Sequence, residues 1–192
     1  WYNNDAAFHS ILNPILDELN SHMVDGIIYI AGHARKINCF PENFGTPAVM
    51  AYAYDQNPMV SAVLPDDETS AYQMTRYLIR KGHKKIALLA GREDNLHTRR
   101  RLKGYQNALF DAQILYNPRL VRYVDWNKQS GYQETKGLLK EDITAIFCMS
   151  DMIAGGVYQY LDEQGLRAGR DVSVVGFDNH VLSEYMIPGL TT

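Results

Sequence analysis

Polar and aromatic side chains that suit a hydroxylated small molecule follow the apolar runs of this sequence. The apolar runs are 48–52, 86–90, 120–124, 145–148 and 172–177. The side chains that stand at their ends or shortly after them are Tyr52, Asn95, His97, Arg101, Asp125, Trp126, Ser150, Asp151, Asp178 and Asn179. A guanidinium and carboxylates hydrogen-bond adjacent hydroxyl groups, and an indole covers the apolar C–H face of a sugar ring. If the runs are parallel strands, these side chains share the edge at which α/β sheets bind ligands. The pattern therefore predicts one site for a polyhydroxylated small molecule.

Several of these residues also have a purely structural interpretation. Arg101 closes a run of three arginines, and a charge run usually lies on a solvated face. Trp126 could seal a strand end, and Ser150 could serve only as a helix cap. Asp178 could be a turn former. The sequence leaves both interpretations open for each residue, and their joint placement at one edge favours a site.

Motifs that would indicate catalysis or a bound cofactor do not occur in the sequence. There is no glycine-rich loop of the kinds that hold phosphates. Ser150 lacks the flanking glycines of a nucleophile elbow, and no His-x-x-x-His pair indicates a zinc-binding helix. The acids 66–68 are better explained as the first turn of a helix than as a cation site. We therefore predict a protein that is not an enzyme and that uses no cofactor or metal.

Apolar runs that predict strands alternate with amphipathic stretches that predict helices. The helical stretches begin after Asp5 and continue at 66–81, 98–112, 131–140 and 151–164. This order predicts an α/β fold in which a parallel sheet of about seven strands carries helices on both faces. The near-continuous apolar run 26–30 predicts a strand buried on both faces. Ser130 and Gln133 fit a capping box at the start of one helix, and 31–46 reads as irregular.

Composition and charge exclude several classes of protein. The 192 residues include 19 Lys and Arg against 22 Asp and Glu, which gives a formal charge of −3 without the basic excess of a nucleic-acid-binding surface. Two cysteines cannot frame a disulfide scaffold, and no apolar run approaches the roughly 18 residues of a membrane helix. The chain begins Trp1-Tyr2 with neither an initiator Met nor a signal peptide, so we expect a piece of a longer protein.

Five segments of the sequence resemble the effector-binding core of LacI/GalR-type transcriptional repressors. They read GHKKIALLAG at 82–91, RLKGY at 101–105, TAIFCMSD at 144–151, GLRAGRDVSVVGFDN at 165–179 and PGLTT at 188–192. The fourth segment is close to the family's Gly…Gly-x-Asp…Ser-Val-Val-Gly-aromatic-Asp signature. The resemblance runs through most of residues 47–192, and residues 1–46 fit the pattern more loosely.

The resemblance implies a fold of two Rossmann-like subdomains with parallel sheets, similar to periplasmic sugar-binding proteins, with the effector between them. On this basis 1–64 is an incomplete N-terminal subdomain and 65–192 is the C-terminal subdomain. The family's helix-turn-helix headpiece, which binds operator DNA, lies outside this chain. The resemblance also implies a homodimer that acts in the cytoplasm without contact to a membrane.

The resemblance assigns roles to the residues at the predicted edge. By the family pattern Arg101 and Asp178 hydrogen-bond the effector and Trp126 stacks on it. The positions that lie near the ligand in relatives also include Asn95, His97 and Tyr52. The positions that correspond to a dimer-interface stretch include Tyr185, Met186 and Ile187.

Two departures from the family pattern limit what can be transferred. Ser150 stands where many relatives have Asn, so an amide contact is shortened or lost. Tyr52 stands where the lactose repressor has a carboxylate, so a galactoside-type contact does not carry over. The resemblance therefore predicts a small sugar-like effector without naming it.

Our main hypothesis is the ligand-sensing module of a sugar-responsive repressor. Two alternatives remain open, a periplasmic sugar-binding protein of a transport system and a purine-responsive regulator. A helix-turn-helix or a signal peptide in the parent protein would separate the first alternative from the main hypothesis. An enzyme on a related α/β fold is the weakest interpretation.

Overall fold

The computed structural model describes residues 5–32 and 36–192. The start of the chain, which prompted the expectation of a longer protein, lies outside these residues. The chain divides into two compact units, Trp1–Pro65 and Asp66–Thr192. Among the described residues no helix has both the length and the apolar character to cross a membrane.

The first unit is built on a small parallel sheet. Its elements are α1 (Asp5–Ser21), β1 (Ile27–Ile30), β2 (Lys36–Ile37), β3 (Ala48–Ala51), β4 (Tyr54–Asp55) and β5 (Ser61–Val63). Three strands pair in the order β1-β3-β5, and β2 pairs with β4. Leu12 and Leu16 of α1 are buried with Met50 of β3 in one apolar cluster, so the helix covers one face of the sheet.

The strand predicted at 26–30 is present as β1. The prediction that both of its faces are buried is wrong, as the exposure of its side chains among the described residues shows. Ile28 is 73% exposed and Ile30 is 76% exposed, while Ile27 and Tyr29 pack against the α1 cluster. Alternate side chains of a strand point to opposite faces, and α1 covers only one of these. The apolar run by itself could not indicate that one face lacks a cover.

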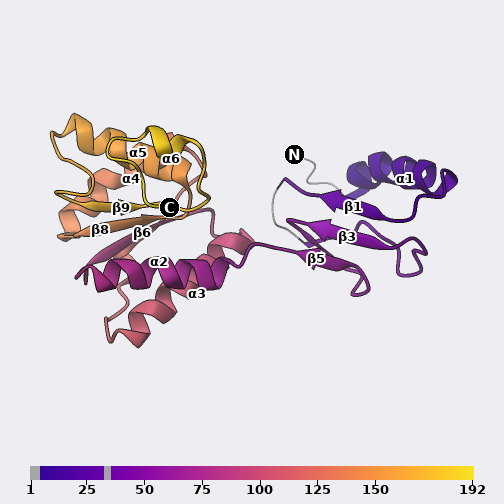
Figure 1. Cartoon of the computed structure of the whole chain (residues 1–192), viewed down its shortest axis with the longest axis horizontal. Helices are drawn as coiled ribbons and strands as arrows, with labels where there is room; N and C mark the ends of the chain where they lie inside the picture. Colours follow the sequence, from indigo (N-terminus) through magenta and orange to yellow (C-terminus); the bar gives the residue numbers. More distant parts are fainter. Residues whose placement is uncertain (1–4, 33–35) are drawn as a thin grey trace. The chain divides into compact units, whose positions relative to one another are not determined.

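The second unit is a four-stranded parallel sheet between two helical layers. Its strands are β6 (Ile86–Ala90), β7 (Val121–Tyr123), β8 (Ala145–Cys148) and β9 (Ser173–Val175), in the order β7-β6-β8-β9. Figure 1 shows helices on both faces of this sheet. The layers are α2 (Asp67–Arg80) with α3 (Leu96–Asp111), and α4 (Lys128–Leu138) with α5 (Asp151–Glu163). The α/β fold with parallel sheets is therefore confirmed, whereas the single sheet of about seven strands expected from the order of elements is wrong, because the described strands form separate sheets of three, two and four strands.

The central strands of this sheet are buried on both faces, as their sequences predict. Every residue of β6 and β8 is buried. Leu89 and Ile146 pack toward the α4–α5 layer, whereas Leu88 and Phe147 pack toward the α2–α3 layer. Continuous apolar runs suit such strands because both of their faces meet a helix layer.

In each helical layer the two helices make close contact at a glycine. A Cβ on Gly104 of α3 would lie 2.1 Å from the carbonyl oxygen of Glu68 in α2, and one on Gly156 of α5 would lie 2.0 Å from that of Lys128 in α4. Only a residue without a side chain lets the two backbones approach so closely. The close crossing of α2 and α3 matters because these two helices carry much of the site described below.

Helix starts differ from the predicted ones where a nearby Asn provides the cap. Helix α3 begins at Leu96, two residues before the start predicted at 98, and the Asn95 side chain accepts hydrogen bonds at this start. Asn127 caps α4 by accepting from the Ser130 amide, so the capping box predicted at Ser130 is wrong. No pattern in the sequence predicts the short helix α6 (Leu182–Tyr185) or the β2–β4 pair.

Candidate functional site

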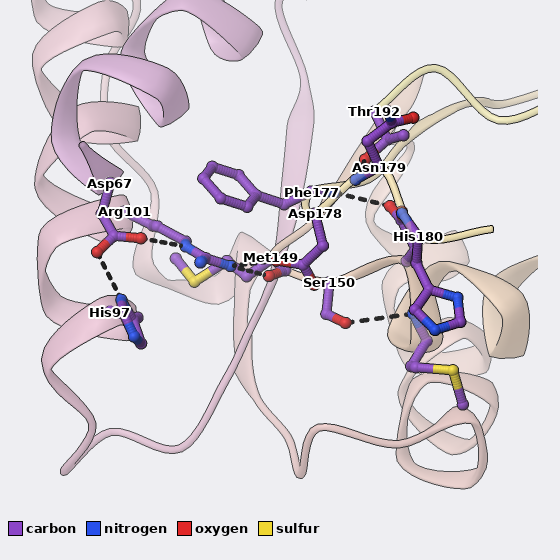
Figure 2. A network of polar contacts seen from close by, with 12 residues as sticks. Asp67, His97, Arg101, Met149, Ser150, Phe177, Asp178, Asn179, His180 and Thr192 are labelled. Atoms are coloured by element: carbon purple, nitrogen blue, oxygen red, sulfur yellow. Dashed lines mark hydrogen bonds and ion pairs between the residues drawn. The ribbon is translucent and has the colours of Figure 1, made fainter. Parts of the chain in front are cut away.

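Arg101 lies at the centre of a buried polar cluster where α3 meets the carboxyl ends of β8 and β9. Its side chain is 3% exposed. Nε donates to Asp67 Oδ1 at 2.8 Å, and Nη1 donates to the main-chain oxygen of Met149, just past the end of β8 (Figure 2). Nη1 also lies 3.7 Å from Asp178 Oδ1. The solvated-face interpretation of Arg101 is therefore wrong, whereas Arg99 of the same run is exposed.

Asp67, the first residue of α2, joins Arg101 to His97. Its Oδ2 lies 2.6 Å from His97 Nδ1, and both side chains are buried. Burial alone would raise the pKa of Asp67, but the hydrogen bonds from His97 and Arg101 hold that pKa below its ordinary value. The carboxylate thus stays charged and fixes the Arg101 guanidinium from behind.

Aromatic rings cover the Arg101 guanidinium. Its carbon Cζ lies 3.5 Å from the Phe177 ring centroid and 5.8 Å from that of Trp126. A planar guanidinium gains from stacking on such rings. Among the described residues, the hydrogen bonds and ion pairs of Arg101 are made by Nε and Nη1, and none is made by the second terminal nitrogen, Nη2. Nη2 is therefore the nitrogen of the guanidinium group that remains available to a ligand.

Asp178 stands in a strained bend three residues after the end of β9. Its φ is 111° and that of Asn179 is 49°, so two consecutive residues adopt left-handed backbone. Partial burial raises the pKa of Asp178, while the charge of Arg101 and a hydrogen bond from Ser150 oppose that rise. The turn-former interpretation of Asp178 and its placement beside Arg101 are therefore both correct, and strain of this kind often accompanies function.

Asp151 holds this turn in place. Its carboxylate is buried and accepts from the main-chain N–H groups of Phe177 at 2.9 Å and His180 at 2.7 Å. A Cβ on Gly176 would lie 2.0 Å from Asp151 Oδ1, so only glycine fits there. Asp151 thus supports the backbone that carries Asp178.

Two of the predicted site residues are helix caps. Asn95 Oδ1 accepts from the His97 amide at 2.8 Å, and Ser150 Oγ accepts from the Met152 amide at 3.2 Å. The capping role expected as the structural interpretation of Ser150 is correct. Neither cap removes the residue from the site, because the Asn95 amide nitrogen can still donate and the Ser150 hydroxyl donates to Asp178.

Trp126 packs across the end of β6. The indole lies over Gly91, where a Cβ would fall 1.9 Å from Cζ2, and it packs against the cores on both sides of the sheet. The side chain is only partly buried. The indole therefore seals the strand end, and its ring centroid lies 5.8 Å from Arg101 Cζ.

Tyr52 belongs to the first unit, directly after β3. It has a φ of 68°, is 38% exposed, and donates its main-chain N–H to the Val63 oxygen at 2.9 Å. Its role beside the residues of the second unit stays a prediction.

The assembled groups suit binding more than bond breaking. The cluster holds a fixed guanidinium, carboxylates, a hydroxyl and two aromatic rings, which is a set that hydrogen-bonds and stacks. Phe177 and Asp178 also line a cavity of about 540 Å³ beside α2. Burial raises the pKa of the nearby Cys148 thiol well above its ordinary value, so Cys148 is not an activated nucleophile.

The sequence profile described as "Periplasmic binding proteins and sugar binding domain of LacI family" matches residues 5–187. The chain belongs to this family. It is 32% identical over 183 residues to the ribose operon repressor of Haemophilus influenzae, covering 94% of this chain and 55% of the repressor. It is 33% identical over 193 residues to the transcriptional repressor PurR of Vibrio atlanticus, covering 98% of this chain and 58% of PurR.

Solved structures of the LacI family share this fold. A LacI family regulator from Enterococcus faecium with bound ribose superimposes with a TM-score of 0.74 at 29% identity, covering 91% of this chain and 66% of the other. A putative LacI regulator from Bacillus cereus gives a TM-score of 0.75 at 32% identity, covering 94% and 65%. The chain spans about half the length of the curated LacI-family relatives it matches.

The predicted dimer-interface residues of this LacI-family chain divide between surface and core. Tyr185 is 76% exposed and Ile187 is 94% exposed, and Val181 nearby is 60% exposed. Met186 is instead buried in the core with the α4–α5 layer. A role of this segment in dimerisation therefore depends on Tyr185 and Ile187.

Sequence reasoning missed Asp67 as part of the site. We interpreted it as a first-turn acid of a helix, which it also is. A signal was present in α3, because Arg101 and Tyr105 share the buried face of that helix. An arginine on a buried face requires a carboxylate partner. The Met149 carbonyl and the Phe177 ring carry no comparable sequence signal.

Proposed function

We propose that this chain is the effector-sensing core of a LacI-type transcriptional repressor. The observation that carries the proposal is the buried Arg101 guanidinium, which Asp67 fixes on one side while Nη2 is left for a ligand. Family membership supports it, and so does the ribose bound to the regulator from Enterococcus faecium. The chain has no enzymatic role in this proposal.

The effector we propose is a small sugar-like molecule with adjacent hydroxyl groups. Arg101 and Asp178 hydrogen-bond those hydroxyls, and Trp126 covers an apolar face of the ring. The remaining positions proposed to contact it include Ser150, His97, Asn95 and, from the first unit, Tyr52. The units 1–64 and 65–192 then act as the N-terminal and C-terminal subdomains of the core.

The partners of the whole protein are part of the same proposal. The curated relatives are repressors about twice as long as this chain, so we propose operator binding through a headpiece outside it. Tyr185 and Ile187 contribute to a homodimer. Effector binding favours one arrangement of the dimer and so changes operator affinity in the cytoplasm.

Fluorescence of Trp126 tests where the effector binds. We expect sugar binding to the full-length protein to change tryptophan emission, and Trp126→Phe to remove most of that change. Phe retains a stacking face, so the affinity measured by calorimetry should fall only a few-fold. Sugars and purine bases are titrated in parallel, and circular dichroism checks the fold of the variant. An unchanged emission response in Trp126→Phe would place the effector elsewhere.

A further inference from the structure

We infer that the effector is uncharged, and that the buried Asp67 carboxylate makes the site reject phosphorylated or acidic sugars. This inference rests on the proposed function and adds the charge of the ligand. It follows from the balance of charges around Arg101 and from the way the helix starts at this edge are capped.

Carboxylates outnumber cations around the ligand-facing guanidinium. Asp67 lies 2.8 Å from Arg101 Nε, and Asp178 lies 3.7 Å from Nη1. Asp151 is also buried, and its carboxylate raises the pKa of Asp178, as a second negative charge close by does. Two carboxylates, those of Asp67 and Asp178, thus lie beside the one guanidinium of Arg101, and the Asp151 carboxylate acts on Asp178. The positive charge of Arg101 is therefore already balanced before a ligand arrives.

The starts of the four long helices of this unit are capped by side chains of the chain itself. An open helix N-terminus binds anions through its free N–H groups. Here side-chain oxygens of the chain itself already accept from one or two of those groups at each helix, namely Asp66 at α2, Asn95 at α3, Asn127 at α4 and Ser150 at α5. The cap at α2 also carries a negative charge.

A neutral sugar and its phosphate ester should differ strongly at such a site. Hydroxyl groups both donate to Asp178 and accept from Arg101 Nη2, so a neutral diol satisfies both partners. A phosphate only accepts at neutral pH, and it would meet the Asp178 and Asp67 charges in a medium less polar than water. We expect the ester to bind at least about 30-fold more weakly than the free sugar.

Asp67 acts here as a positioning residue with an electrostatic effect. It does not need to touch the ligand, because it fixes Arg101 and neutralises its charge. Asp67→Asn keeps the size of the side chain and an oxygen for Arg101, and it removes the negative charge. Asp66→Asn is the matched control, because Asp66 is exposed and Asn caps a helix as well as Asp does.

The experiment measures calorimetric affinities of the full-length protein for matched pairs, such as ribose with ribose 5-phosphate and glucose with glucose 6-phosphate. We expect a free sugar to bind and its ester to bind at least about 30-fold more weakly. An ester that binds as tightly as its free sugar overturns the inference. If that ester also changes the operator affinity, the proposed function survives. If no member of any pair binds, the uncharged-sugar inference is wrong. If purine bases also fail to bind, the proposed function fails with it.

The variants test the part assigned to Asp67. Asp67→Asn should narrow the ratio between sugar and ester affinities about tenfold, because one nearby negative charge is lost. Asp66→Asn should leave the ratio unchanged. If Asp67→Asn weakens both ligands by the same factor, Asp67 has only a structural role and its assignment as a charge filter is wrong.

Discussion

Replacing Arg101 with alanine is expected to weaken effector binding by about 1.5–3 kcal/mol, roughly 10- to 150-fold, because a charged hydrogen-bond donor is lost. The same change should lower the free energy of unfolding by about 3–5 kcal/mol, since Asp67 loses the cation that compensates its burial. In the structure Asp67 Oδ1 receives the Nε–H of Arg101 at 2.8 Å, and the Asp67 side chain is fully buried.

Calorimetry on the full-length protein gives the effector affinity, and urea unfolding gives the stability. Arg99→Ala is the matched control, because Arg99 comes from the same arginine run but is exposed. We expect that control to change both quantities by less than about 0.5 kcal/mol. An Arg101→Ala protein that binds effector like the wild type would show that the site lies elsewhere.

Gly104→Ala should destabilise the protein by about 3 kcal/mol, near the upper end of overpacking effects. The new Cβ would lie 2.1 Å from the Glu68 oxygen and 2.8 Å from the Tyr72 nitrogen, and both are backbone atoms that no rotamer change can move. Separating α2 from α3 would also move Asp67 away from Arg101. We therefore expect a loss of effector affinity of about tenfold, because binding depends on their relative position.

Gly137→Ala provides the control for this prediction. Gly137 lies in α4, and a Cβ there would meet nothing within 4 Å. Alanine should raise stability by about 0.5–1 kcal/mol through helix propensity alone. If Gly104→Ala behaves like Gly137→Ala in urea unfolding and in effector binding, the close crossing of α2 and α3 does not hold in solution.

The elements of the second unit can be predicted well from the sequence, because each is marked by a pattern of residues that are close together in the chain. Each buried strand reads as an apolar run, and the polar residues that follow those runs mark the edge where Arg101 and Asp178 meet. Helix 66–81 agrees closely with α2, since Asp66 at its start and Gly82 after its end, with a φ of 95°, provide clear signals. Parallel topology brings these separated residues together without further information.

The parts that were missed depend on contacts that no local pattern encodes. Asp67 looks like any first-turn acid until the close crossing of α2 and α3 places it against Arg101. Ile28 and Ile30 look like core residues, and only the position of α1 shows that they lie on the uncovered face. Met186 looks like part of an apolar surface segment, but its side chain turns inward.

Operator affinity of the full-length protein, with and without the sugar that changes Trp126 emission, tests the central claim most directly. Fluorescence anisotropy of labelled operator DNA measures it for the wild type and for Arg101→Ala. If the effector binds at Arg101, the sugar should change the operator affinity of the wild type by at least about fivefold, which is the lower end of allosteric coupling. It should not change the operator affinity of Arg101→Ala. An operator affinity that ignores the sugar, or that shifts equally in the variant, would contradict it.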